Sequence, residues 1–350
     1  MTKKIQSLQG IRAVAFIGIL LQHASVICMG SFGVSVFFIL SGFVAYICSK
    51  DLSLKEAISP VESVKFAIKR IKKIYPTHIM TMLGVAVLLS YEALFVDKSK
   101  DDFIGILRSM LYHVTLTHNW SIAQKNTLNG VSWFLSAILF IYIFAPFMIW
   151  GAKHIKSFSV SIVCFVITLS AQTIFAYFVA GLSDELYLLY NFPIFRMFDF
   201  FIGILVGVCY QKTTWKCSFG TSTIVELLAI VLCIISNIFY ITDSIPLTML
   251  KEDIWFIIPN SFAIFCFAFG KGFFSKILSS RILVKIGDYS GHMFLISQCV
   301  FYYINVIVFK IIGENDLNIM KATLVFVLTY CFTVLWTKVC GKLFNRGNRI

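Results

Sequence analysis

The feature that most constrains this fold is a succession of apolar runs, each close to the ~20 residues that a helix needs to cross a bilayer. We therefore predict an all-α, polytopic transmembrane helical bundle with about ten spans. The predicted spans are 11–29, 33–48, 76–95, 131–150, 157–179, 195–210, 222–241, 254–274, 292–312 and 322–339.

Composition agrees with this prediction and narrows the function classes. Hydrophobic residues make up 59% of the chain and charged residues only 13%, whereas soluble domains carry about a quarter charged residues. A net charge of +13 would suggest nucleic acid in a soluble protein, but here Lys and Arg form short clusters between apolar runs. Such clusters mark membrane topology and contact anionic lipid, so no nucleic-acid partner is expected. The ten Cys are scattered without a CxxC pair, which indicates no disulfide framework and no metal site.

The distribution of positive charge also predicts an orientation. With the N-terminus inside, most Lys and Arg fall into the cytoplasmic segments, as the positive-inside rule requires. Both termini are then cytoplasmic and the number of spans is even. The apolar segment 103–114 is short and contains Arg108, so we interpret it as a re-entrant or interfacial helix. We expect one transmembrane domain over 6–340 and a short basic cytoplasmic tail over 341–350.

Two ionisable residues in the first predicted span are functional candidates, because charge inside a bilayer is costly. Arg12 and His23 are eleven residues apart, so they share one face of a helix and are separated by a rise of ~16 Å. Arg12 would lie at the cytoplasmic mouth and His23 about halfway through the hydrocarbon. Two alternatives stay open: Arg12 could anchor lipid phosphate, and His23 could be a buried imidazole bonded to a carbonyl.

The sequence around this pair resembles the opening of a known family. The stretch 7–15, then His23, then the stretch 33–43 is similar to the start of the acyltransferase-3 family of bacterial membrane acyltransferases. That family carries an Arg-x10-His signature followed by a Gly-Val-x-x-Phe-Phe-x-Leu-Ser-Gly-Phe run. Further stretches resemble the family in the same order: the basic segment with Tyr-Pro at 69–76, Trp-x-Leu-Ser at 133–136, and the spans around 193–203 and 287–296.

The resemblance implies transfer of an acyl group, usually acetyl, from cytoplasmic acyl-CoA to a sugar hydroxyl of an envelope glycan such as capsule, lipopolysaccharide or exopolysaccharide. It implies a multi-pass protein of the bacterial cytoplasmic membrane, whose partners are acyl-CoA, an envelope glycan or lipid-linked sugar, and membrane lipid. No bound cofactor or metal is implied. Basic side chains suit the phosphates of CoA, although the positive-inside signal alone explains any one of them. The expected donor-binding residues are Lys69, Arg70, Lys72, Lys73 and Tyr75.

On the acceptor side, Trp133, Ser132 and Asn129 would open the fourth span near the substrate entrance. Aromatic faces and amides suit sugar rings, but an interfacial Trp is an equally simple explanation. Arg196 and Asp199 are spaced i, i+3, which favours either a polar wall near the entrance or an intrahelical ion pair. His113 and His118 lie in the outer loop, where two His alone are weak evidence for a metal.

The chain departs from the family pattern at two positions. Ile138 stands where many members have Glu, and Ser297 where many have His. His23 could act as a general base or accept the acyl group covalently, and sequence does not separate these routes. Two other functions stay open: a transporter or flippase of glycan precursors, and a degenerate, non-catalytic relative.

Overall fold

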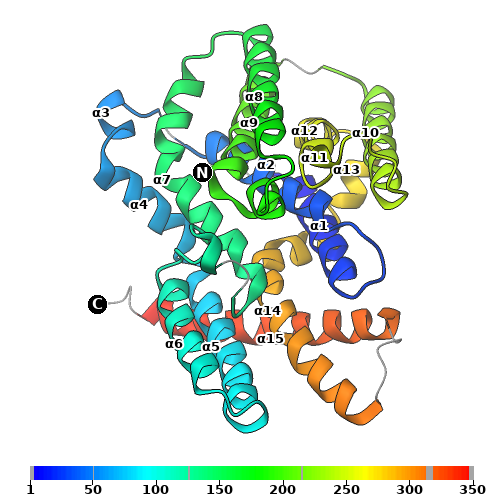
Figure 1. Ribbon diagram of the computed structural model, residues 1–350. Coiled ribbons are helices and arrows are strands. Elements are labelled where there is room, and N and C mark those ends of the chain that lie inside the picture. Colours follow the sequence, from blue (N-terminus) through cyan, green and yellow to red (C-terminus); the bar gives the residue numbers. More distant parts are fainter. Residues whose placement is uncertain (1–3, 50, 125–126, 214–215, 313–317, 347–350) are drawn as a thin grey trace.

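The computed structural model describes residues 4–49, 51–124, 127–213, 216–312 and 318–346, and side chains up to 306 and at 319–341 (Figure 1). Every regular element in these ranges is a helix. Lys3 and Lys50, which the predicted topology places on the cytoplasmic side, and Lys125, which it places on the outer side, lie outside the described residues. Residues 347–350 of the predicted tail also lie outside the described residues. The first part of that tail, 341–346, belongs to the helix α15 (Asn318–Arg346).

Ten long helices overlap the ten predicted spans one by one. They are α1 (Gln6–His23), α2 (Gly30–Ile47), α5 (Tyr75–Tyr91), α7 (Trp133–Lys153), α8 (Phe158–Val179), α9 (Pro193–Lys212), α10 (Phe219–Ile241), α12 (Ile254–Ala268), α14 (Arg281–Ile312) and α15. The remaining elements connect them: α3 (Leu54–Ala57), α4 (Pro60–Ile71), η1 (Glu92–Val96), α6 (Lys100–Val114), η2 (Ile122–Gln124), η3 (Gly130–Ser132), η4 (Tyr187–Asn191), α11 (Thr248–Lys251) and α13 (Phe273–Leu278). The all-helical prediction is therefore confirmed for the described chain.

Seven of the described helical segments are long and apolar enough to cross a membrane, which confirms a polytopic membrane protein but not a count of ten. These seven are Gly30–Ile47, Tyr75–Val96, Gly130–Lys153, Phe158–Val179, Tyr187–Lys212, Phe219–Ile241 and Ile319–Gly341. The other three long helices are α1, α12 and α14, of which α12 has only 15 residues. The number of spans and the cytoplasmic placement of both termini stay predictions.

The predicted boundaries of the first span were wrong at its end. Helix α1 stops at His23, and the chain turns through residues 24–29, where Ser25 adopts a positive φ of 56°. Gly30 and Ser31 are then the first residues of α2 and not the turn itself. His23 therefore sits at the end of a helix, next to a loop.

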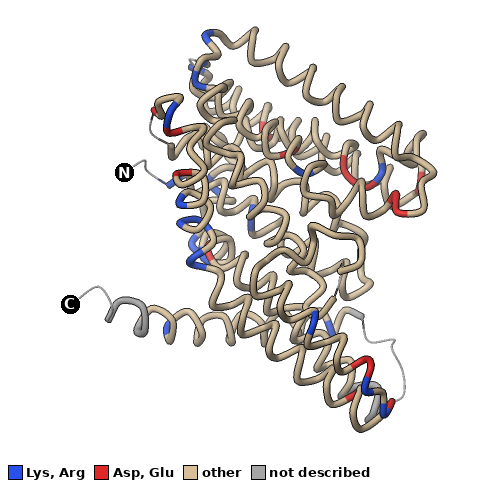
Figure 2. Tube along the Cα trace, turned by 60° about the vertical axis from the view of Figure 1, so that its left-hand side comes forward, with Lys and Arg blue, Asp and Glu red and all other residues tan. Residues whose placement is uncertain are grey.

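The segment predicted as re-entrant or interfacial is the helix α6, which lies alongside α5 (Figures 1 and 2). The Tyr75 hydroxyl donates to the Val114 carbonyl, so the end of α6 returns to the beginning of α5. Ile104, Leu107 and Leu111 are exposed on its outer face. Its place relative to the bilayer stays a prediction.

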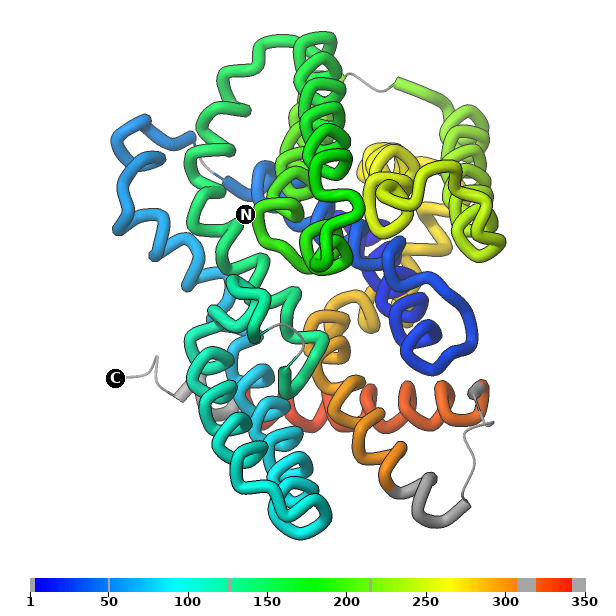
Figure 3. The backbone as a smooth tube through the Cα atoms, in the orientation of Figure 1, coloured from blue at the N-terminus to red at the C-terminus, as the bar shows by residue number. Residues whose placement is uncertain are grey.

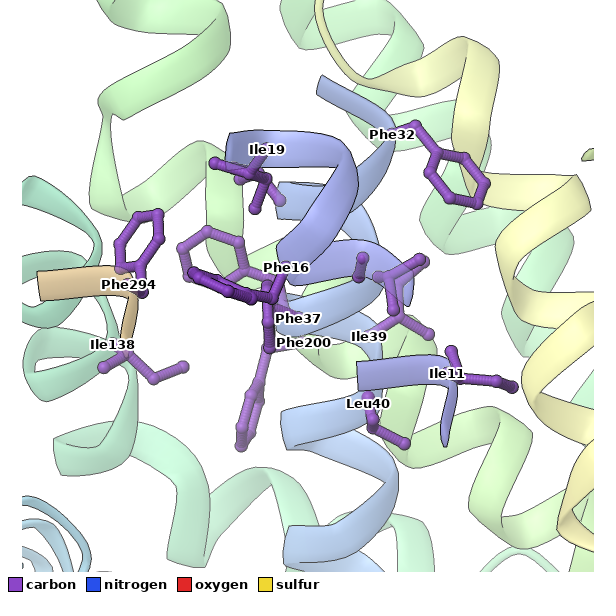
Figure 4. Close-up of a cluster of buried hydrophobic side chains, with 14 of the residues drawn as sticks. Ile11, Phe16, Ile19, Phe32, Phe37, Ile39, Leu40, Ile138, Phe200 and Phe294 are labelled. Carbon is purple, nitrogen blue, oxygen red and sulfur yellow. The ribbon is translucent and has the colours of Figure 1, made fainter. Parts of the chain in front are cut away.

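Helix α2 forms the centre of the bundle, and nearly all its side chains are buried. It crosses α9 so closely that a methyl group on Gly203 would come within 1.9 Å of the Ile39 carbonyl oxygen. Phe16 of α1, Phe37 of α2 and Phe200 of α9 meet in the apolar core that surrounds this crossing (Figure 4). Glycine on both helices allows this approach, as in many membrane helix pairs.

The periphery is apolar where a soluble protein would be polar. Helices α8 and α10 leave side chains such as Val163, Ile167, Ile224 and Leu228 exposed. The backbone tube shows these two helices at the rim of the bundle (Figure 3). Lys and Arg gather along one edge of the molecule, with a second group of mixed charges at the tip of the α5–α6 hairpin (Figure 2). An apolar belt between polar ends fits a protein held in lipid.

The close crossing of α2 and α9 gives a test of the fold. Substitution Gly203→Ala forces a methyl carbon against the Ile39 carbonyl, and overpacking of this kind costs roughly 1–3 kcal/mol. We expect a lower apparent unfolding temperature in detergent, followed by fluorescence-detected size-exclusion chromatography after heating. The control is Gly151→Ala in α7, where nothing lies within 4 Å of the new methyl group and helix propensity favours Ala. Equal unfolding temperatures for the two variants would contradict the packing described here.

Candidate active site

His23 opens into a pocket of about 360 Å³ at the point where six segments of the chain converge. Its imidazole is exposed to this space and its ring centroid lies 6.3 Å from that of Phe301. We call this space the His23 pocket. It is lined by Ile19, Gln22, His23, Gly30, Ser31, Val34, Gly130, Val131, Trp133, Leu186, Tyr190, Asn191, Glu252, Phe294 and Gln298.

Arg12 faces a different space, of about 570 Å³, which we call the basic cavity. Helix α1 is continuous from Gln6 to His23, so Arg12 and His23 are three turns apart on one helix, as their spacing predicts. The lining residues of the basic cavity are Lys4, Gln9, Arg12, Lys73, Lys285, Asp288, Tyr289, His292, Thr337 and Lys338. Four Lys and one Arg against one Asp make it strongly electropositive.

Two further cavities lie between these end sites, and each shares lining residues with its neighbours. The Arg70 cavity, of about 280 Å³, shares Arg12, Lys73, Asp288 and His292 with the basic cavity. A small apolar space of about 50 Å³ shares Phe37, Ile74, Phe134, Leu135 and Gly291 with the Arg70 cavity, and Val34 and Phe294 with the His23 pocket. We call it the phenylalanine constriction, because Phe134 packs edge-on against Phe37 and Phe294 with ring centroids about 6 Å apart.

The structure divides the expected donor-binding residues into three groups. Arg70 and Lys73 line the Arg70 cavity, and Lys73 also lines the basic cavity. Lys72 and Tyr75 line a separate apolar groove, while Lys69 is exposed and lines none of the cavities described here. Sequence reasoning missed Lys4, Lys285 and Lys338 as members of one site, since distant segments bring them together.

Of the expected acceptor-side residues, Trp133 alone lines the His23 pocket. Asn129 is buried behind it and donates to the Thr81 hydroxyl and the Leu295 carbonyl, at 3.0 Å each. The Ser132 hydroxyl lies 3.3 Å from His113 Nδ1 and 3.2 Å from His118 Nε2. These two side chains position the start of α7 and hold Trp133 in place.

The three imidazoles behind Ser132 are stacked and buried. The rings of His113 and His118 lie 3.8 Å apart, and His78 stacks within about 6 Å of both. Burial, followed by the nearby His78, lowers the pKa of His118 to about 3, so this imidazole is neutral at physiological pH. In the described part of the chain no group of three or more His, Cys, Asp or Glu is arranged to hold a metal ion.

Arg196 and Asp199 form the intrahelical ion pair that their spacing allows, with 2.9 Å between Nη1 and the carboxylate. Both side chains are fully buried, and Asp253 makes a second ion pair with the same guanidinium. Gln172 of α8 donates to both carboxylates, at 2.8 and 2.9 Å. The guanidinium also lies against the rings of Tyr190 and Trp133, at 4.9 and 5.9 Å. We call this group the Arg196 cluster; it supports the aromatic wall of the His23 pocket from behind.

The polar residues that face His23 across the pocket were missed by sequence reasoning. Glu252 is partly buried, accepts a hydrogen bond from the Ser31 hydroxyl at 3.4 Å, and lies just before α12. Burial raises the pKa of this carboxyl group above its usual range. Gln22, Asn191 and Gln298 complete the polar lining. The acidic pair at 252–253, directly before an apolar run, was the available signal.

The two departures from the family pattern occupy distinct environments. Ile138 is buried in the wall of the Arg70 cavity and does not line the His23 pocket. The Ser297 hydroxyl donates to the Phe294 carbonyl within α14. Neither residue supplies a proton-transfer group to the His23 pocket.

Comparison with known proteins now decides the family. The model of an acyltransferase domain family matches residues 5–338, nearly the whole chain. The chain belongs to the acyltransferase-3 family. It is similar to "Acyltransferase MdmB" of Streptomyces mycarofaciens, with 25% identity over 307 residues that cover 82% of this chain and 72% of that relative. No solved structure matches. The chain is therefore a membrane O-acyltransferase, as the motifs around Arg12 and His23 led us to expect.

The Arg196 cluster provides a test within this acyltransferase. Substitution Arg196→Met leaves two buried carboxylates without their cation, and breaking a buried pair in this way costs roughly 3–5 kcal/mol. We expect a large loss of thermal stability in detergent. The control is Lys251→Met, which breaks the more exposed pair with Asp243, worth ~1 kcal/mol or less. A stable Arg196→Met protein would show that the cluster does not hold these helices together.

Proposed function

We propose that this acyltransferase moves an acyl group, preferentially acetyl, from cytoplasmic acyl-CoA to a hydroxyl of an extracytoplasmic cell-surface glycan in the bacterial cytoplasmic membrane. The observation that carries the proposal is the chain of cavities from the basic cavity to the His23 pocket. Each cavity shares lining residues with the next, so the four lie in a row between a site for a polyanion and a site with an imidazole.

The basic cavity suits the nucleotide part of the donor. Its cations can bind several phosphates, and Arg12 offers the planar fork that matches a phosphate group. Among the described residues, no acceptor bonds Arg12 Nε and no donor bonds Gln9 Oε1, although both atoms are buried. Buried polar atoms of this kind are normally satisfied, and a phosphate oxygen would satisfy the arginine donor.

The thin arm of the donor suits the route to His23. The rise from Arg12 to His23 is ~16 Å, which the flexible thioester arm of CoA spans when extended. The phenylalanine constriction is apolar and has a volume of only about 50 Å³, so in the proposed reaction a linear acyl chain suits it better than a sugar ring. This size difference favours acyl transfer over the alternative of a sugar transporter, which would need a passage wide enough for its cargo.

The chemistry at His23 balances without a further reactant. The acceptor hydroxyl attacks the thioester carbonyl while neutral His23 takes the hydroxyl proton. The carbon–sulfur bond then breaks, the new ester stays on the sugar, and the departing sulfur receives the proton from the imidazolium. If His23 first carries the acyl group itself, the same bonds are exchanged in two steps. Both routes need an imidazole that reaches the open pocket, which a degenerate relative would not need to keep.

Loss of the imidazole tests the proposal directly. Purified protein in liposomes, with labelled acetyl-CoA on the basic-cavity side and envelope glycan of the source cell on the other, should transfer label to the glycan. His23→Ala should lower this rate by roughly 10²–10⁴-fold, the usual contribution of a general base. His154→Ala is the matched control, because that exposed imidazole lines none of the four connected cavities. Turnover that survives in His23→Ala would remove His23 from the mechanism.

The donor site is tested by two lysines that are close in sequence. Lys73→Ala removes a cation from the basic cavity and should raise KM for acetyl-CoA roughly tenfold or more, as expected for one charged hydrogen bond. Lys69→Ala should leave KM unchanged, since Lys69 is exposed and away from the cavity. Equal effects of the two substitutions would indicate a diffuse surface attraction and contradict a donor site in the basic cavity.

A further inference from the structure

The acidic side chain in the His23 pocket, Glu252, has no role in the reaction proposed above. Glu252 is the only Asp or Glu among the described residues that line this pocket, and none of them is Lys or Arg. Its neighbour Lys251 is ion-paired with Asp243, and Arg196 lies behind the rings of Trp133 and Tyr190, so both cations act on Glu252 from outside the pocket lining. Glu252 therefore brings an acidic group into a pocket whose lining contains no cation.

The position of Glu252 is fixed by the residue that follows it. Asp253 is fully buried and ion-paired with Arg196, so the start of α12 is tied to α9. The Ser31 hydroxyl at the start of α2 donates to the Glu252 carboxylate from the other side. Two neighbouring acids thus have different tasks: Asp253 anchors the backbone and Glu252 faces the pocket.

Glu252 and His23 face the same space without bonding to each other. No hydrogen bond joins the two described side chains, and both contribute to a pocket of about 360 Å³ that also contains Trp133 and Tyr190. A ring lying against these aromatic faces would have the imidazole and the carboxylate within reach of different hydroxyls. A carboxylate can accept hydrogen bonds from two adjacent hydroxyl groups at once.

We infer that Glu252 binds the acceptor, and that the sugar receiving the acyl group carries adjacent hydroxyls and no negative charge. This inference rests on the proposed function and adds the substrate class. An anionic sugar would place a like charge beside Glu252 in a pocket whose lining contains no cation to bind it, which is unfavourable away from bulk water. The acyltransferase then has opposite electrostatics at its two ends: cations for the polyanionic donor and a carboxylate for the neutral acceptor.

The experiment uses glycan that lacks the modification. The gene is deleted in the source organism, the surface glycan is purified, and the acetyl groups missing from it are located by NMR on the wild-type material. We expect these acetyl groups on an uncharged sugar. Acetyl groups on a uronic, sialic or phosphorylated sugar would overturn the inference and leave the proposed function intact. If the deletion changes no acetylation, the proposed function itself fails and this inference falls with it.

The residue is tested with the same glycan as the probe. Protein in liposomes is assayed with acetyl-CoA on one side and unacetylated glycan on the other. Glu252→Gln should raise KM for the glycan roughly 10- to 100-fold, the loss expected for charged hydrogen bonds, while KM for acetyl-CoA stays unchanged. Asp101→Asn, which changes an exposed carboxylate outside the pocket, should behave as wild type. An unchanged glycan KM in Glu252→Gln would overturn the assignment.

A second variant covers the case of misfolding. Glu252→Asp keeps the charge with a shorter side chain, so it should fold and retain part of the glycan affinity. If Glu252→Gln unfolds in detergent at a lower temperature than wild type, the glycan KM of Glu252→Asp decides. A rise for this variant with an unchanged acetyl-CoA KM supports acceptor binding, and no rise rejects it.

Discussion

A guanidinium buried in a membrane protein can persist only where carboxylates neutralise it, and the Arg196 cluster shows how much of this structure depends on that requirement. Arg196 and Asp199 come from α9, Asp253 from the start of α12 and Gln172 from α8. The same cation lies against Trp133 at the start of α7. Four helices are therefore held at the same point, directly behind the aromatic wall of the His23 pocket. The ion pairs of this cation thus position the aromatic wall that would receive a sugar in the proposed reaction.

Helix α1 fixes the distance between the two ends of the reaction. Its continuous turns place Arg12 in the basic cavity and His23 in the pocket, and neither side chain can approach the other without breaking backbone hydrogen bonds. In the proposed reaction, the length of α1 keeps the donor phosphates and the acceptor hydroxyl apart, and the small apolar phenylalanine constriction lies between their sites. The proposal therefore requires only the thin acyl-bearing arm of the donor to reach between the two sites.

Sequence predicted well the features that depend on local spacing. The apolar runs gave ten helices in the right order, and the eleven-residue interval put Arg12 and His23 on one helix. It predicted poorly the features that depend on which distant segments meet. Lys72 and Tyr75 follow Arg70 in the chain but face another groove, whereas Lys285 and Lys338 join Lys73 from the far end of the sequence. Asn129 and Ser132 carry the right chemistry for a sugar, yet their hydrogen bonds are used in the packing of α7. A polar residue in an apolar run indicates that burying its side chain costs free energy. Only the tertiary contacts show whether a neighbouring residue or a ligand offsets that cost.

The same reasoning explains why the missing family residues need not imply lost activity. Ile138 lies on the donor side of the constriction, and Ser297 bonds within its own helix. Glu252 enters the His23 pocket from an unrelated part of the chain, at the start of α12. A pocket formed by six segments can acquire a carboxylate from any of them, provided that the backbone at that point is fixed, as Asp253 fixes it here. The proposed reaction requires a suitable side chain inside the pocket, and residues at several positions in the sequence can place one there.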